Sequence, residues 1–190
     1  MENLKDKIQK HNLWINHRDS GEQMQLDKCV IENIKLLNDD INTSIYSEVQ
    51  FKNSTIHNVN LSGSSWFNCE FENIDFEKVN LRKTEFHQCK FTNCNFNICN
   101  ISKSEFYDTE ISNSNYSLIN LKWAYVANCV FNNILFQKIE VENLIFFDCN
   151  FSKTKFNDIN FNESYPLKYI IGTITREITQ TDILNELAKF

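Results

Sequence analysis

The sequence predicts a repeat fold of the solenoid class, in which short units stack into coils along one axis. Two periods carry this prediction. Every fifth residue from Leu26 to Phe161 is apolar or aromatic, which makes twenty-eight positions without an exception. Residues of one kind also recur at every twentieth position, from Ile41 through Leu61 to Phe161. Neither period fits the face of a helix or the alternation of a half-buried strand.

The five-residue unit has a second position that is directed inward. Two residues before each large apolar residue, the side chains are mostly small or β-branched, and Asp39 is the only charged one from Met24 to Ile159. Polar residues fill the remaining positions. The unit therefore reads small, polar, large apolar, polar, polar.

This pattern resembles the pentapeptide-repeat family, whose units read roughly Ala/Cys/Ser/Val, Asp/Asn, Leu/Phe and two variable residues. The clearest matches are Val59-Asn60-Leu61, Val79-Asn80-Leu81, Cys94-Asn95-Phe96, Cys99-Asn100-Ile101, Ile119-Asn120-Leu121 and Cys149-Asn150-Phe151. The resemblance implies an all-β solenoid, a right-handed, four-sided parallel β-helix in which four units form one coil. Residues 24–164 would form about seven coils, because like residues stack where successive coils pair as parallel strands. Phe replaces the usual Leu at many positions, so we expect a bulky, aromatic core.

Two further columns of the twenty-residue period are rich in asparagine. One runs from Asn33 to Asn133, and the other runs from Asn60 to Asn160 with Glu140 as its one interruption. Asn tolerates left-handed backbone angles and bonds its own backbone two residues further on, so corner turns would select it. We favour this interpretation over a prion-like low-complexity tract.

Residues 1–23 predict an N-terminal cap. Their apolar residues are partly at helical spacing, which indicates a short amphipathic helix followed by a loop through Gly21. The stretch from Ile8 to Ile15 resembles the cap found ahead of many pentapeptide-repeat domains. Because open strand edges invite association, we expect this segment to cover the first coil, and His11 and Trp14 to pack within it.

Residues 165–190 predict a C-terminal cap that begins where Pro166 breaks the register. A β-branched stretch from Leu167 to Thr175 indicates a strand, and Thr181 to Phe190 indicates a short helix. Related rods dimerise through this end, so the resemblance implies a possible homodimer. The dimer or cap candidates on the apolar side of this helix are Ile183, Leu184, Leu187 and Phe190.

Charge and composition exclude several classes of function. The net charge of −6 at pH 7 argues against direct binding to nucleic acid or to an anionic membrane. No apolar run has the length of a transmembrane helix, and the N-terminus lacks a signal-peptide apolar region, so we expect a cytoplasmic protein. The inward positions carry no paired carboxylates, acid or base, and a core filled with Phe leaves no ligand cavity. We therefore predict a non-enzymatic protein without a cofactor.

All seven cysteines fall on the small inward position, where free Cys serves as a small hydrophobe. Disulfides between Cys69 and Cys89 or between Cys129 and Cys149 are an alternative, because one coil separates each pair. An odd count and a reducing compartment make them less favoured. A zinc site is less favoured still, because no His occupies an inward position.

No residue is inserted between the repeats, so function must come from a smooth face or from the ends. Apolar or aromatic residues at outward positions are therefore informative. The candidates for binding a partner are Phe67, His87, Tyr107, Trp123, Tyr125, Ile145 and Phe147. A terminal segment that covers them, a protein partner or second subunit, and scattered exposure without a role remain open.

Two functions follow. The first is a rigid protein-binding module of the inhibitor, immunity or scaffold type. The alternative is a DNA mimic that binds gyrase or another topoisomerase and protects it against poisons, as some members of the family do. The candidates for the mimic are Glu70, Glu72, Glu85, Glu105, Asp108 and Glu110. Interleaved cations would dilute this negative track, namely Lys52, Lys78, Arg82, Lys83, Lys90 and Lys103.

Overall fold

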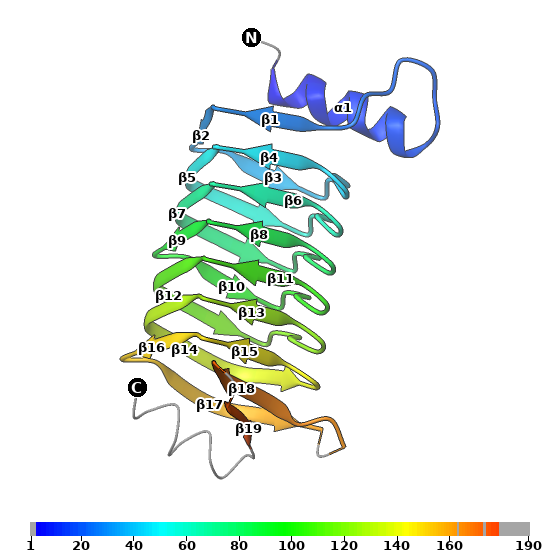
Figure 1. Ribbon diagram of the computed structural model, residues 1–190. Helices are drawn as coiled ribbons and strands as arrows, with labels where there is room; N and C mark the ends of the chain where they lie inside the picture. Colours follow the sequence, from blue (N-terminus) through cyan, green and yellow to red (C-terminus); the bar gives the residue numbers. More distant parts are fainter. Residues whose placement is uncertain (1–2, 163, 173, 179–190) are drawn as a thin grey trace.

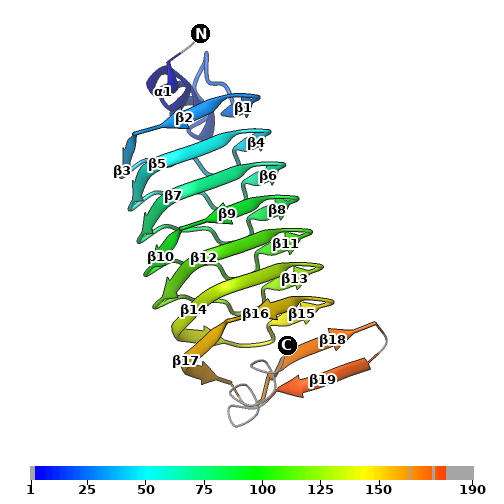
Figure 2. The ribbon, with the colours of Figure 1, turned by 90° about the vertical axis from the view of Figure 1, so that its left-hand side faces the viewer.

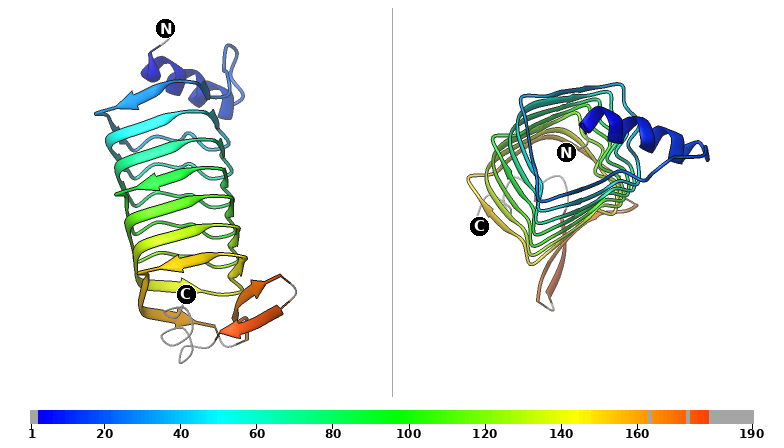
Figure 3. Two further views of the ribbon diagram at one scale, coloured as in Figure 1. Left: turned by 60° about the vertical axis from the view of Figure 1, so that its left-hand side comes forward. Right: turned by 90° about the horizontal axis from the view of Figure 1, so that it is seen from above.

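A computed structural model describes residues 3–162, 164–172 and 174–178 and shows a right-handed, four-sided parallel β-helix of about seven coils (Figure 1). Each residue lies beside the residue twenty places further on, so Leu26 pairs with Tyr46 and Tyr46 with Trp66. Seen from above, the coils trace a four-sided outline (Figure 3). The four-unit coil predicted from the sequence is confirmed.

One side of the rod is a nine-stranded sheet, parallel except for its last strand, and its outer surface is called face 1. Its strands are β1 (Gln25–Asp27), β4 (Ile45–Ser47), β6 (Ser65–Phe67), β8 (Glu85–His87), β11 (Glu105–Tyr107), β13 (Tyr125–Ala127), β15 (Ile145–Phe147), β18 (Leu167–Ile171) and β19 (Ile174–Ile178). In each three-residue strand the central side chain is buried and its two neighbours are directed outward.

The second sheet has ten strands and bends around one corner, so it forms two sides of the rod, faces 2 and 3 (Figure 2). Its strands are β2 (Val30–Glu32), β3 (Lys35–Leu37), β5 (Gln50–His57), β7 (Glu70–Glu77), β9 (Lys90–Thr92), β10 (Asn95–Asn97), β12 (Glu110–Ser117), β14 (Val130–Val141), β16 (Asn150–Ser152) and β17 (Lys155–Phe161). β2, β9 and β16 lie on face 2, whereas β3, β10 and β17 lie on face 3. On the fourth side, face 4, isolated β-bridges join successive coils between residues twenty apart. They run from Asp40 through Asn60 and Asn80 to Glu140.

The corners explain the period of five. Every fifth residue from Lys28 to Asp158 has a positive φ, a backbone region that L-residues seldom adopt. The asparagine column from Asn33 to Asn133 occupies one of these corners, as predicted.

The column that contains Asn60 lies three residues before a corner. There the side-chain oxygen accepts the N–H two residues later, as Asn60 does from Ser62 at 3.2 Å. The amide nitrogen donates to the preceding coil, as Asn80 does to Asn60 at 3.0 Å. Asn is therefore favoured in the second column because its side chain bonds the backbone two residues later, and not because it tolerates a positive φ.

The core consists of stacked side chains along the axis. All twenty-eight large residues of the repeat are buried except Phe161, which is half-buried. Phe71 and Phe91 stack with their centroids 4.4 Å apart and their planes 2° apart, and Tyr46 stacks on Trp66 at 3.6 Å. The seven cysteines are free thiols, and all but Cys29 are buried, so they act as core residues.

The N-terminal helix α1 (Leu4–Ile15) lies across the open end of the first coil, as predicted (Figure 3). Asn3 begins it, because its side chain accepts the N–H of Lys5. On its buried side, His11 Nδ1 accepts the N–H of Met24 at 2.9 Å. A Cβ at Gly21 would lie 2.3 Å from the backbone nitrogen of Trp14, so glycine is required where the loop returns. No helix in the described part of the chain is long and apolar enough to span a membrane.

The prediction of one strand from Leu167 to Thr175 is wrong. β18 and β19 form an antiparallel hairpin with Gly172 at its turn, where φ is +56°. β18 also pairs with β15 and so extends the sheet of face 1. The predicted helix and its dimer candidates, Ile183, Leu184, Leu187 and Phe190, lie outside the described residues.

Candidate binding face

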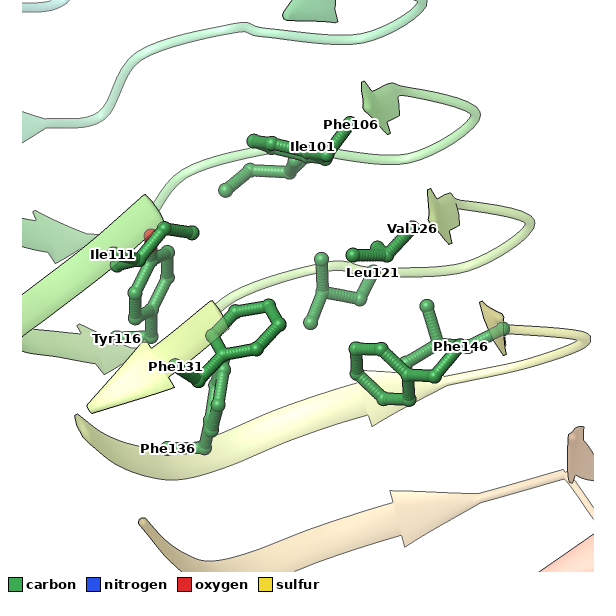
Figure 4. Close-up of a pocket in the computed structure, with 10 residues that line it drawn as sticks. Ile101, Phe106, Ile111, Tyr116, Leu121, Val126, Phe131, Phe136 and Phe146 are labelled. Atoms are coloured by element: carbon green, nitrogen blue, oxygen red, sulfur yellow. The ribbon is translucent and has the colours of Figure 1, made fainter. Parts of the chain in front are cut away.

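The described part of the core contains a small void. A cavity of about 20 Å³ lies among apolar side chains near Ile111 and Val126, and Figure 4 shows the residues that line it. These two residues interrupt columns that hold an aromatic ring in both neighbouring coils, which explains the missing volume. The cavity has room for about one water molecule, so a site for a ligand must be sought on the surface.

Face 1 carries a continuous stack of partly exposed rings, which we call the aromatic ladder: Phe67, His87 and Tyr107. The centroids of Phe67 and His87 are 5.1 Å apart, and those of His87 and Tyr107 are 5.0 Å apart, with 15° between the planes in both pairs. β6, β8 and β11 place these residues in register in successive coils. Phe67 remains 38% exposed at the end of the stack.

Apolar side chains continue the ladder toward the C-terminal end of the rod. The ring of Tyr125 lies tilted 5.9 Å from that of Tyr107, and Ile145 follows Tyr125 in the same column. In the column of the ladder itself, Ala127 is buried and Phe147 comes next.

Ile170 of β18 then lies beside Phe147. The period of twenty does not predict this contact, because the repeat ends at Pro166 and Ile170 lies twenty-three residues after Phe147 and not twenty.

Trp123 does not belong to the ladder. It stands at a corner with a φ of +61°, and its ring lies 5.5 Å from that of Tyr165. Its indole nitrogen donates to Glu142 at 3.2 Å. Trp123 is thus partly covered by the segment after the last coil, which a column pattern cannot predict because Tyr165 lies outside the repeat.

Two carboxylates flank the ladder on the same face. Glu85 and Glu105 are neighbours on β8 and β11. Glu85 lies 3.5 Å from Nε2 of His87, and the hydroxyl of Tyr107 donates to Glu105 at 2.5 Å. This hydrogen bond raises the pKa of Tyr107 to about 12, because the phenolate would lie against a carboxylate. The face therefore offers ring edges beside fixed negative charge.

The remaining candidates for the DNA mimic lie on the adjoining face. Glu70, Glu72 and Glu110 are on face 2, and Asp108 stands at the corner between faces 1 and 2. Lys90 sits between Glu70 and Glu110, with its Nζ 3.8 Å from Glu110.

The expected interleaving of cations is only partly correct. Lys52 and Lys90 do share face 2 with the acidic residues. The other four cations lie on face 4 or at its corners, namely Lys78, Arg82, Lys83 and Lys103. Negative charge therefore gathers on faces 1 and 2.

A comparison with protein families agrees with this architecture. The family model of the pentapeptide repeat region matches residues 62–126. No curated protein matches the chain. Among solved structures, trypsin-treated QnrB1, described as a plasmid-mediated fluoroquinolone resistance protein, is 10% identical; the match covers 72% of this chain and 92% of that one, with a TM-score of 0.30.

Two cyanobacterial structures are similar at the same level. HetL of Nostoc sp. strain PCC 7120, a pentapeptide repeat protein involved in heterocyst differentiation regulation, is 11% identical over 84% of this chain and 95% of that one, with a TM-score of 0.27. The pentapeptide repeat protein Rfr23 of Cyanothece 51142 is 11% identical over 88% and 99%, with a TM-score of 0.30. The family match shows that residues 62–126 form a pentapeptide repeat region, and the five-residue repeat itself is unbroken from Leu26 to Phe161.

Proposed function

We propose that the protein is a non-enzymatic, rigid protein-binding module, and that face 1 is its docking surface. The observation that carries the proposal is the partly exposed stack of Phe67, His87 and Tyr107 on the surface of face 1. Aromatic residues that remain at the surface of a well-packed protein are typical of interfaces. No described element lies in front of this face in Figure 1, so an outside molecule can reach it.

The chemistry of the face indicates what the partner presents. Ring edges next to Glu85 and Glu105 fit a protein surface that carries arginine or lysine among apolar residues. The cation would pair with the carboxylates while its aliphatic stem or a neighbouring apolar residue covers the rings. Because the two carboxylates are already held by His87 and Tyr107, little side-chain freedom is lost on binding.

An affinity capture that names a partner, repeated with matched variants, tests this proposal. Tyr107→Asp and Phe147→Asp place charge on face 1, and Asn97→Asp makes a similar change on face 3. We expect the named partner to be lost with the first two variants and retained with the third. Retention with all three variants would discard face 1 as the docking surface.

A second candidate function is DNA mimicry at a topoisomerase. The clustering of Glu85, Glu105 and Asp108 with the acidic residues of face 2 supports it, because Lys78 and Arg82 lie away from this cluster, while Lys83 and Lys103 stand at the corner that face 4 shares with face 1. Such a mimic would be one-sided, with its negative surface confined to two adjoining faces.

A gyrase supercoiling assay with and without a quinolone tests the second candidate. We expect the parent protein to alter supercoiling or to protect gyrase, and Glu85→Gln with Glu105→Gln to weaken the effect. Glu140→Gln with Glu142→Gln removes the same charge from face 4 and is the control. If a stoichiometric excess of the parent protein has no effect on gyrase, mimicry is ruled out.

A further inference from the structure

Face 4 and its corners carry a compact positive surface, which we call the basic patch: Lys78, Arg82, Lys83, Lys103 and Lys122. It spans three coils, and residues 78–83, 98–103 and 118–123 contain no carboxylate. Among the described residues, only Lys122 of this patch pairs with an acid, Glu140, at 3.0 Å. In a chain of net charge −6 this concentration of unpaired cations is unusual, and face 1 does not account for it.

Two apolar side chains stand at the corner that borders the basic patch. Ile98 has a φ of +55° and is 44% exposed, and Leu118 has a φ of +56° and is 49% exposed. In other coils the same corner holds polar residues, Asn38, Asn58, Lys78, Lys138 and Asp158.

A positive φ is costly for a β-branched residue, and a side chain that stays 44% exposed, as Ile98 does, gains only part of the usual burial in return. Strain that stability does not explain points to a function for the side chain.

The two side chains border a groove. It has a volume of about 330 Å³, and Ile98, Leu118, Ile119, Lys138 and Glu140 line it with the amides of Asn100 and Asn120. Asn100 donates to Asn80 at 3.3 Å, so the amides along the floor already bond from coil to coil. The cations of the basic patch do not line this groove, so the groove supplies the apolar corner and the charged contacts must come from the adjoining patch.

We propose that face 4 binds a short acidic segment of a protein that also carries apolar residues. Carboxylates of the segment would pair with Lys78, Arg82, Lys83 and Lys103, and an apolar side chain would lie against Ile98 and Leu118. This is a second interaction surface, opposite in charge to face 1, and Lys83 and Lys103 stand at the corner that the two faces share.

The limits of the patch favour a short peptide over a nucleic acid. Asp40 lies toward one end, and Glu140 and Glu142 close the other end, so the cations extend over only about 10 Å at about 4.8 Å per coil. An extended peptide covers that distance with about three or four residues. Single-stranded nucleic acid needs free aromatic rings for its bases, and Trp123, the aromatic residue within the three coils on this side, is already packed on Tyr165.

Fluorescence anisotropy at low and physiological salt tests the proposal with three labelled probes: a short peptide of Glu and Leu, the same peptide with Gln for Glu, and a short thymidine oligonucleotide. We expect the acidic peptide alone to bind the parent protein. Lys83→Glu with Lys103→Glu should weaken binding about tenfold or more, because like charges then meet. Glu48 shows that glutamate is accepted at such a corner.

The matched control is Lys52→Glu with Lys90→Glu on face 2, which changes the net charge equally and should leave binding within about twofold. A further variant, Ile98→Asn, separates function from folding. It should keep or raise the midpoint of thermal unfolding, because Asn tolerates the positive φ, and it should weaken binding of the acidic peptide.

Four results would overturn the proposal. They are no binding of the acidic peptide, tighter binding of the oligonucleotide, equal losses in the two charge-reversal variants, and binding unchanged by Ile98→Asn. Sedimentation velocity at low salt tests in addition whether face 4 binds a second copy of the chain. Self-association that disappears with Lys83→Glu and Lys103→Glu, without peptide binding, would assign face 4 to a second copy of the chain.

Discussion

Tyr107 lies stacked on His87 in the preceding coil, with 5.0 Å between the ring centroids, while its hydroxyl donates to Glu105. The ladder is thus joined to the acidic column of face 1 by a hydrogen bond as well as by stacking. Each side chain of the pair limits the rotamers of the other, so the docking surface is ordered before any partner arrives.

The first prediction concerns the phenol of Tyr107, whose pKa is raised to about 12 mainly by the hydrogen bond to Glu105. Glu105→Gln should lower this pKa, because the phenolate would no longer lie against a charge. Tyrosinate absorbance during an alkaline titration measures the change, and Tyr107→Phe identifies the transition that belongs to this residue.

The same pair predicts the direction of an effect on stability. The pKa of Tyr107 is higher in the folded than in the unfolded chain, so its contribution to stability is complete below about pH 10 and is lost between about pH 10 and 12. The stability of the Tyr107→Phe variant should therefore fall less than that of the parent protein over this pH range. A titration identical in the parent protein and in Glu105→Gln would contradict the assigned cause.

The second prediction concerns the aromatic core. Phe91 is buried and stacks on Phe71 at 4.4 Å, so Phe91→Ala should lower the free energy of unfolding by about 3–5 kcal/mol. Phe91→Leu should cost less, because it leaves a smaller cavity. Unfolding in guanidinium measures both. Phe67→Ala on face 1 is the control, and a loss as large as that of Phe91→Ala would contradict the assignment of Phe67 to the surface.

The repeat made the core and the corners predictable from sequence. The strict period of five identifies the inward positions in every coil, such as those of Phe91 and Cys94. The period of twenty identifies which residues stack on one another. The aromatic ladder could also be predicted from the sequence, because Phe67, His87 and Tyr107 are spaced twenty residues apart. In such a rod, a column of the sequence becomes a column in space.

Departures from the period were not predictable in the same way. Packing of Trp123 on Tyr165 and the hairpin of β18 and β19 depend on residues from Tyr165 onward, where the register ends. The separation of charge between faces 2 and 4 follows from the period of twenty once each charged residue is assigned to its column. The order of residues along the chain hides it, because Lys83 at the corner and Glu85 on face 1 are only two residues apart.

The third prediction concerns the cavity next to Ile111. Ile111→Phe would place a ring between Phe91 and Phe131 and fill the void of about 20 Å³. We expect the free energy of unfolding to rise by about 0.5–2 kcal/mol, as for other cavity-filling changes. The control is the same substitution at Ile41, which lies in an aliphatic column and does not line the cavity. Ile41→Phe should cost about 1–3 kcal/mol by overpacking, and destabilisation of similar size in both variants would contradict the account of the cavity.

The fourth prediction concerns His11 in the N-terminal cap. Burial lowers the pKa of this imidazole below 6.5, and its Nδ1 accepts the N–H of Met24, so the folded protein holds the neutral form. The unfolded chain binds a proton more readily, so this contribution to stability is complete above about pH 6.5 and is lost as the pH falls below it.

Urea unfolding midpoints measured from pH 8 to pH 5 test this sign, with His11→Asn beside the parent protein. The Asn side chain keeps an acceptor for the N–H of Met24 but carries no titratable group, so the midpoint should fall less steeply with acid. His57→Asn removes a histidine from face 3 and should follow the parent protein. Equal slopes in the parent and His11→Asn would show that acid acts elsewhere in the rod, and that protonation of the cap does not open the first coil.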